Sequence, residues 1–444
     1  MLKKCPLLLA LLLFSVHLFA QGQADTSDKQ LTLKQCVDFA LKNQPAVRQA
    51  AIDEAINEKN IGISLSAWLP QVTSSGLYNY YFKGSPVFST PTGVSPAGGN
   101  IDNLSSLGLQ VNQVIYNNDV LQAAKAAKYS RQYYKQNTLS SQINVVSDVS
   151  KAFFDVLLSE RQLEILNEDI TRLQRSLKDA YTQYQAGTVD KTDYKQATIN
   201  LNNSISGRKQ TEEAIKSKLA YLRQVMGLGA SGNLSLVYDS SRYESEAVID
   251  TNQQLDPNNR IEYQLLQTQR NLQNVNISYY KWGFLPSLSA TGAYSWFYLS
   301  HSFSTLYDSS IPSGYVGLTL NVPIFQGNKR LQNLSKARLQ ATRADLDITN
   351  EKNSINTEYT EALASYKSNY TNWKLLKQNV ALSKDVYKVV SLQYREGVKT
   401  YLDVIVAQSD LRTEELNYYN ALFQLLSSKI DLQKALGTLT VPQN

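Results

Sequence analysis

Hydrophobic side chains recur at helical spacing through two unusually long stretches of the chain. Residues 119–186 contain 68 positions without a proline. Apolar residues in this stretch follow alternating steps of three and four, the spacing of a coiled-coil seam. They are Leu163, Leu166, Ile170, Leu173, Leu177, Ala180 and Tyr184. At about 1.5 Å per residue, the stretch predicts a helix roughly 100 Å long. Residues 328–396 predict a second such helix, of 69 residues.

Each predicted long helix reaches a glycine and turns back into a second helical segment. The return segments are 190–226 and 400–436, with 37 residues each. A helix of that length covers only the far half of its long partner. Residues 32–66 and 258–283 also have helical patterns and are available for the near halves. The sequence therefore predicts two long, two-layered antiparallel rods.

Between the helical stretches, the hydrophobic period changes to two, which is typical of strands. The strand-like segments are 70–82, 104–116, 287–299 and 314–325. The apolar row in the last segment is Val316, Leu318, Leu320 and Val322. The residues between them are small or polar. Such alternation fits a strand of a soluble sheet, or a strand with hydrocarbon on one side and water on the other.

Aromatic side chains favour the membrane interpretation of these segments. The strands contain Tyr78, Tyr80, Tyr81, Phe82, Tyr294, Trp296, Phe297 and Tyr298. Aromatic residues of this kind form the interfacial girdles of outer-membrane barrels. The connecting segments 83–103 and 300–313 are then predicted to be exposed extracellular loops, and 83–103 is rich in Gly, Pro and Ser.

The chain also repeats itself at an offset near 210 residues. The matching landmarks are Leu69-Pro70 with Leu285-Pro286, Tyr184-x-x-Gly187 with Tyr394-x-x-Gly397, Asp193 with Asp403, and Gly227 with Gly437. Because these landmarks occur in the same order, we predict two copies of one structural unit. The expected organisation is a signal peptide (1–20), a first repeat (21–227), an equatorial linker (228–257) and a second repeat (258–444).

Four strands are too few to close a barrel, because bacterial single-chain barrels begin at about eight strands. The edges of the predicted sheet must therefore pair with other copies of the chain. A trimer would supply twelve strands and six rods, and a ring of rods would enclose a tunnel. The residues alone require oligomerisation without setting the number of copies.

The first 20 residues predict a secretory signal peptide rather than an N-terminal membrane anchor. Lys3 and Lys4 precede an apolar run over 5–19, and small Ala20 suits the position before the cleavage site. The run is short for a membrane-spanning helix. Cleavage would leave Cys36 as the single cysteine, with the spacing of a small buried residue.

Composition changes this picture in two ways. The formal net charge is +6, of which two charges lie in the signal segment, so the remaining +4 is too small to indicate nucleic acid as a partner. Charged residues make up 18% of the chain and there are 28 tyrosines, so much of the surface is expected to be uncharged or away from water. No apolar segment of about 20 residues follows the signal, so membrane-spanning elements must be strands.

Residues for enzymatic chemistry are scarce. His301 is the only histidine after the signal segment, and it falls in a predicted loop. A histidine-based triad or metal site has little to build on, and the sequence has no G-x-x-x-x-G-K-[ST] phosphate loop. We therefore predict that the protein is not an enzyme and that it holds no cofactor or metal centre.

The opening Leu-Thr-Leu-x-x-x-Val-x-x-Ala-Leu-x-Asn over 31–43, the two Leu-Pro strand starts and the two Tyr-x-x-Gly turns together resemble TolC-like outer-membrane efflux proteins (outer membrane factors). The resemblance covers nearly the whole mature chain. It implies a mainly α fold with transmembrane β-strands. Three copies would form a 12-stranded outer-membrane barrel continued by a periplasmic α-helical tunnel. The linker and the short C-terminal tail would form an equatorial region.

The resemblance also implies a gate at the periplasmic tip, where the glycine turns lie. The tip residues it assigns are Tyr184, Gly187, Asp193, Tyr394, Gly397, Lys399 and Asp403. In relatives, the tyrosine at Tyr394 bonds the acidic residue at Asp193, and the basic position at Lys399 is usually Arg. Asp403 matches an acidic ring in the closed entrance, although the second acidic position of that ring is Val406 here.

Two interpretations of these tip carboxylates remain open from the residues. Charge-assisted hydrogen bonds between neighbouring helix ends would hold the tip closed, and breaking them would shift the population towards an open state. Alternatively, Asp193 and Asp403 cap the return helices.

The function implied is a passive exit duct of a tripartite export system in a Gram-negative cell. It would carry small molecules such as drugs, or proteins in type I secretion. Its partners would be outer-membrane lipid, a periplasmic adaptor (membrane fusion protein) and an inner-membrane pump. The alternative is a secreted coiled-coil structural or adhesive surface protein, which predicts sustained heptads without membrane strands.

Overall fold

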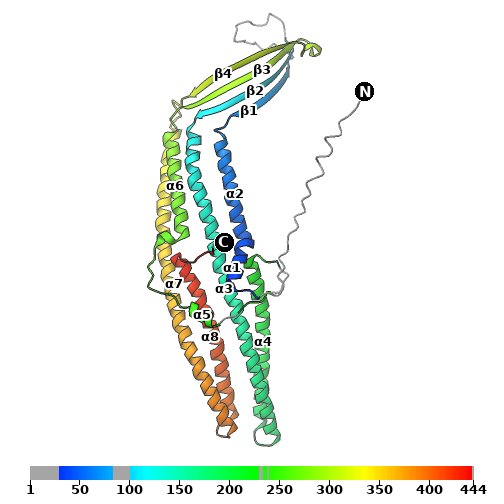
Figure 1. Ribbon diagram of the computed structural model, residues 1–444, viewed down its shortest axis with the longest axis vertical. Coiled ribbons are helices and arrows are strands. Elements are labelled where there is room, and N and C mark those ends of the chain that lie inside the picture. Colours follow the sequence, from blue (N-terminus) through cyan, green and yellow to red (C-terminus); the bar gives the residue numbers. More distant parts are fainter. Residues whose placement is uncertain (1–29, 84–100, 230–233, 238–239, 443–444) are drawn as a thin grey trace, which may run out of the picture.

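Two long helices set the shape of the molecule. The computed structural model describes residues 30–83, 101–229, 234–237 and 240–442. The predicted signal segment and most of the predicted loop at 83–103 lie outside the described residues. The helices α3 (Asn118–Gln185) and α7 (Lys329–Arg395) run from a sheet at one end to two glycine turns at the other (Figure 1).

Shorter helices lie along these two long ones (Figure 1). The helix α2 (Pro45–Ser66) packs on the half of α3 nearer the sheet, and α4 (Lys191–Met226) packs on the half nearer the turn. In the second repeat, α6 (Ile261–Trp282) and α8 (Tyr401–Leu436) divide α7 in the same way. Each repeat is therefore an antiparallel pair of helical layers.

Four of these helices end in the same backbone motif. Their C-terminal glycines have φ between 70° and 74°: Gly187, Gly227, Gly397 and Gly437. At the first turn, the Thr188 N–H donates to Gln183 O and the Gly187 N–H donates to Tyr184 O, both at 3.0 Å. This is a Schellman motif, which requires a left-handed residue and so favours glycine. The repeated glycines seen in the sequence are therefore the points where the chain leaves a helix.

The four strands form one antiparallel sheet in the order β1-β2-β3-β4. The strands are β1 (Gln71–Tyr80), β2 (Asn103–Tyr116), β3 (Ser287–Ser300) and β4 (Ser310–Asn321). Because β2 and β3 pair in the centre, the sheet joins the two repeats, and β1 and β4 are its edges. These edges have no strand partner in the described part of the chain.

The fourth strand was predicted over 314–325, and this range was wrong at both ends. It begins at Ser310, because Ser310 pairs with Tyr298 of β3. It ends at Asn321, since Pro323 has no N–H to donate and the chain turns into the start of α7. Pro312 within the strand is tolerated because β4 is an edge strand.

The helix α3 is the packing centre of the molecule. It contacts α2, α4 and α1 (Leu33–Asn43) of its own repeat and also α6 and α8 of the other repeat. The largest apolar cluster lies around its middle, where Phe153, Leu157 and Leu422 are almost fully buried. Cys36 is fully buried in the same cluster, and burial raises the pKa of its thiol to about 12. The thiol therefore stays protonated at neutral pH.

The predicted linker is tied to α7 by side chains of that helix, among them the buried Tyr366. Its helix α5 (Ser240–Glu246) lies beside the middle of the rods (Figure 1). The hydroxyl of Tyr366, which is 2% exposed, donates to Ala247 O at 3.0 Å and accepts from Ile249 N at 2.9 Å. The N-terminal segment joins the same region, because Leu31 forms a parallel bridge with Leu236. None of the described helices has both the length and the apolar content needed to cross a membrane.

The glycine turns lead to a stability prediction. Ala at Gly437 would place its Cβ 2.5 Å from Asn259 O, whereas Ala at Gly397 would meet nothing within 4 Å. Both substitutions put a side chain at positive φ, which costs about 1–2 kcal/mol. We expect Gly437→Ala to cost about 1–3 kcal/mol more, because of the clash. Thermal unfolding of the detergent-solubilised protein, followed by circular dichroism, measures this. Equal unfolding midpoints for the two variants would contradict the packing at Asn259.

Candidate functional site at the helix tips

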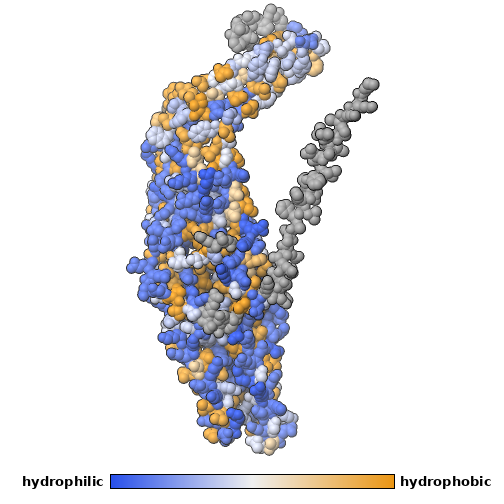
Figure 2. Space-filling model, in the orientation of Figure 1, coloured by the Kyte–Doolittle hydropathy of each residue, from blue (hydrophilic) through white to orange (hydrophobic). Residues whose placement is uncertain are grey.

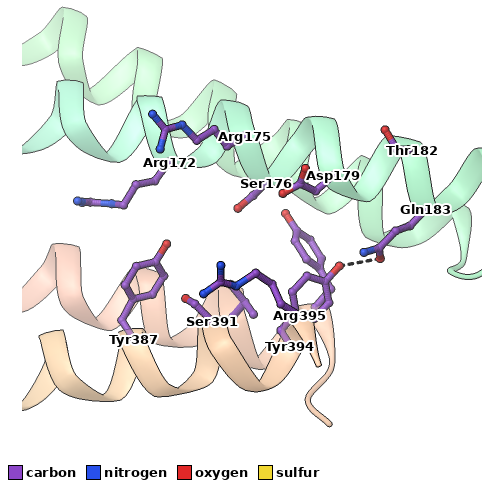
Figure 3. Close-up of a pocket in the computed structure, with 12 residues that line it drawn as sticks. Arg172, Arg175, Ser176, Asp179, Thr182, Gln183, Tyr387, Ser391, Tyr394 and Arg395 are labelled. Atoms are coloured by element: carbon purple, nitrogen blue, oxygen red, sulfur yellow. Dashed lines mark hydrogen bonds between the residues drawn. The ribbon is translucent and has the colours of Figure 1, made fainter. Parts of the chain in front are cut away.

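The two helical rods meet near their turns through a hydrogen bond. Tyr394 on the last turn of α7 donates its hydroxyl to Gln183 Oε1 on the last turn of α3, at 2.8 Å (Figure 3). Asp193 was expected to accept this bond, and that expectation was wrong. Asp193 lies on the first turn of α4, and the acceptor is Gln183. Burial raises the pKa of Tyr394, and the negative charges of Asp179 and Asp193 add to this rise. The hydroxyl therefore remains a donor at neutral pH.

A second tyrosine joins the rods through apolar contact. Tyr401 is the first residue of α8 and is only 4% exposed. Its ring packs with Ala180 of α3 and Ala197 of α4, and its centroid lies 5.9 Å from that of Tyr394. The sequence pattern alone did not single out this residue. The available signal was its helical spacing with Val404 on the buried face of α8.

The first turn is shaped by a cap and an aromatic contact. Asp190 is the N-cap of α4, and its carboxylate accepts from Thr192 N at 2.9 Å. Asp190, not Asp193, therefore caps this helix. Tyr184 lies against Tyr194 across the turn, with ring centroids 5.1 Å apart. The turn at Gly187 thus holds α3 and α4 together by backbone geometry, a cap and ring packing.

The second turn has a complete capping box. Thr400 N donates to Asp403 Oδ2 at 2.9 Å, and Asp403 N donates to Thr400 Oγ1 at 3.3 Å. Lys399 Nζ lies 3.8 Å from Asp403 Oδ1. The hydrogen bonds from Thr400, with the charge of Lys399, hold the pKa of Asp403 below its usual range. Asp403 therefore caps α8 as a carboxylate after the turn at Gly397. Its place in an acidic ring stays a prediction, since a ring needs several chains.

A buried polar network joins three helices further from the turns. Asp169 of α3 is 1% exposed and lies 18 residues before Gly187, about 27 Å along the helix. Its carboxylate accepts from Ser204 Oγ of α4 at 2.8 Å and from Gln408 Nε2 of α8 at 2.9 Å. Arg412 Nη1 lies 3.5 Å from Asp169 Oδ2. Sequence spacing could not show this network, because its members are far apart along the chain.

These contacts are suited to holding helices together rather than to catalysis. Near the tips, the groups that form hydrogen bonds between the rods are a phenol, two amides, a hydroxyl, a guanidinium and one buried carboxylate. Among the described residues, no group of three or more His, Cys, Asp or Glu side chains could hold a metal ion. The tip is therefore a set of polar and apolar contacts between helix pairs, and separating the pairs would break them.

Comparison with known proteins agrees with this architecture. The outer membrane efflux protein family matches residues 37–228 and 255–438, one segment for each repeat. The outer membrane protein TolC of Vibrio cholerae is 21% identical over 412 residues, covering 92% of this chain and 91% of that protein. TolC of Escherichia coli is 22% identical over 453 residues, covering 99% of this chain and 87% of that protein.

A solved structure shares the fold. The CmeC outer membrane channel of Campylobacter jejuni superposes with a TM-score of 0.73 at 19% identity, covering 91% of this chain and 85% of that one. At this identity the likeness shows the fold alone. The family match, by contrast, spans most of both repeats. The chain belongs to the outer membrane efflux protein family.

Proposed function

We propose that three copies of this chain form the exit duct of a tripartite export system. As an outer membrane efflux protein, the chain is a channel component located in the outer membrane. The proposal adds the trimer, a periplasmic adaptor and an inner-membrane pump. Three sheets would close a 12-stranded barrel, and six rods would enclose a tunnel through the periplasm.

The open, apolar edge of the sheet is the observation that carries the proposal. Val316, Leu318 and Leu320 on the edge strand β4 are 90%, 70% and 62% exposed. A long exposed hydrophobic edge strand is unfavourable for a monomer in water, because its backbone groups and apolar face are both unpaired. Figure 2 shows hydrophobic residues gathered on the sheet and at its junction with the helices. Pairing with other copies in a membrane would satisfy both the edge and the apolar face.

The helices support self-association independently of the sheet. Buried residues number 22 of 68 in α3 but only five of 67 in α7. Several exposed apolar residues of α7 are spaced by seven: Leu339 and Leu346, then Leu375, Leu382 and Val389. Heptad spacing on an exposed face indicates packing against another helix. A neighbouring copy of the chain would cover this face in the assembled tunnel.

The proposed duct is passive. The sequence contains no phosphate-binding loop of the G-x-x-x-x-G-K-[ST] type, so the energy for export would come from a partner. We propose that an adaptor binds the helix tips and that the pump selects the substrate, whether a small molecule or a secreted protein. The alternative of a secreted coiled-coil adhesive protein predicts no membrane strands. The four-stranded sheet and the family match contradict it.

Two measurements on the detergent-solubilised, full-length protein test the proposal. Multi-angle light scattering should report three chains per particle, and planar lipid bilayers containing the protein should show discrete conductance steps. A monomer that produces no conductance would overturn the proposal. A conducting assembly of another size would refute the trimer but would still support the channel function.

A charge on the proposed lipid face should block assembly. Leu318→Lys places a lysine among the apolar residues of β4, at an expected cost of about 2–4 kcal/mol if the site lies near the membrane centre. Thr319→Lys adds the same charge to the opposite face and is the matched control, because alternate strand residues face opposite sides. We expect Leu318→Lys to reduce the amount of assembled protein in outer-membrane fractions and Thr319→Lys to leave it nearly unchanged. Equal losses for the two variants would contradict the assignment of faces.

Removing the hydrogen bond between the rods should favour the open tip. The double variant Gln183→Leu/Tyr394→Phe loses the bond at 2.8 Å that joins α3 to α7. A loss of about 1 kcal/mol per chain would shift the closed-to-open ratio roughly fivefold, so single-channel conductance should rise.

A matched control removes a similar bond that does not cross between the rods. The Tyr181 hydroxyl accepts from Gln185 Nε2 at 2.8 Å, and both residues are on α3. We expect Tyr181→Phe to leave the conductance as in the unaltered protein. If the control and the double variant conduct equally, the bond between the rods does not hold the tip closed.

A further inference from the structure

A cavity of about 550 Å³ separates the two rods on the sheet side of the Tyr394–Gln183 bond. In Figure 3, Arg172 of α3 and Arg395 of α7 extend into this space from opposite rods. Arg175 and Asp179 of α3 also line the cavity. The lining residues thus supply three guanidinium groups and one carboxylate, while the carboxylates of Glu168, Asp169 and Glu415 lie within 4 Å of Arg172 and offset part of its charge. The guanidinium groups in the wall can therefore donate to an anion from both rods.

Within the described part of the chain, several donors in the cavity wall lack a hydrogen-bond acceptor. The Tyr401 hydroxyl, the Ser391 hydroxyl, and Nε and Nη2 of Arg172 form no hydrogen bond with the described residues. Tyr401 is 96% buried, since its side chain and backbone together are 4% exposed. Buried polar groups in proteins are nearly always hydrogen-bonded, so each unpaired donor calls for an explanation.

The acidic neighbours of Arg172 are too far away to accept hydrogen bonds from its unpaired N–H groups. Its guanidinium lies 3.6 Å from Glu168 and 3.9 Å from both Asp169 and Glu415, which is beyond good hydrogen-bond distance. Burial is the main cause that raises the pKa of Tyr401, and the charges of Asp193 and Asp179 add to the rise. The Tyr401 hydroxyl therefore keeps its proton and offers a donor at neutral pH.

We propose that this cavity binds a small oxyanion, such as a phosphate, between the two rods. Arg172 would hold it from α3 and Arg395 from α7, and the hydroxyls of Tyr401 and Ser391 would donate to its oxygens. Guanidinium groups suit oxyanions because their N–H groups form a planar fork that can bind two oxygens at once. A metal cation would face three positive charges here, and an apolar ligand would leave the unpaired donors unsatisfied.

The position of the site gives the anion a role in gating, and this step rests on the proposed function. Arg172 belongs to the first rod, whereas Arg395 and Tyr401 belong to the second. An anion held by both rods binds the arrangement in which they lie together more tightly than one in which they have separated. It therefore shifts the population towards the closed tip, by mass action.

Phosphate binding to the assembled, detergent-solubilised protein tests the site directly. Isothermal titration calorimetry with inorganic phosphate, at constant ionic strength set by chloride, should show saturable binding. Tyr401→Phe keeps the ring and removes one donor, and Arg395→Gln removes one charge. We expect each to weaken phosphate binding about tenfold, as for loss of one hydrogen bond to a charged group. Sulfate should compete with phosphate, because it presents the same array of oxygens.

The matched control is Arg343→Gln, which removes the same charge from an exposed position of α7 outside the cavity. It should bind phosphate like the unaltered protein. Absence of saturable binding, or equal weakening by Arg343→Gln and Arg395→Gln, would overturn the site.

Conductance measurements distinguish a failure of the anion's gating role from a failure of the proposed channel. Phosphate should lower the conductance of the unaltered channel and have little effect on Arg395→Gln. Binding without any change in conductance would refute the gating role alone. If the protein forms no channel, the proposed function fails, but calorimetry still decides whether the anion site exists.

Discussion

The structure depends on one constraint: a helix of about 100 Å with an apolar seam cannot bury that seam by itself. The helix α3 solves this by packing against helices of both repeats, α2 and α4 from its own and α6 and α8 from the other. Since each of these covering helices is shorter than α3, two from each repeat are needed to cover its length. The covering helices begin and end at the glycine turns and at the breaks midway along the rods.

The same constraint is not met on α7, where many apolar side chains are exposed in the single chain. Few residues of α7 are buried, and within the described residues the sheet edges β1 and β4 have no strand partner. Another copy of the chain could pack against the exposed face of α7 and pair with the edges β1 and β4. The unmet packing and hydrogen-bonding needs of the chain are thus the physical basis for the proposed assembly.

The contacts between the rods differ along their length. Around the middle they are large and apolar, with Phe153 and Leu422 almost fully buried. Closer to the tip, the rods meet through the buried carboxylate of Asp169, and beyond it a cavity lined by arginines separates them. At the tip itself, the contacts are the packed ring of Tyr401 and the hydrogen bond of Tyr394. Apolar cores resist separation more than a few hydrogen bonds do. This gradient is consistent with the proposed opening at the tip, because fewer apolar contacts would have to break there than at the centre.

The sequence by itself determined the helices, the strands and their doubling, because periodicity, proline-free length and glycine turns are local properties. The long helix expected over 119–186 is α3 at Asn118–Gln185, within one residue. Tertiary structure alone decided what each tip side chain meets. Tyr394 bonds Gln183 rather than Asp193, and Tyr401, Gln408 and Ser204 enter the site from distant positions. Such partners depend on how two rods rotate and slide against each other, and helical periodicity carries no information about that.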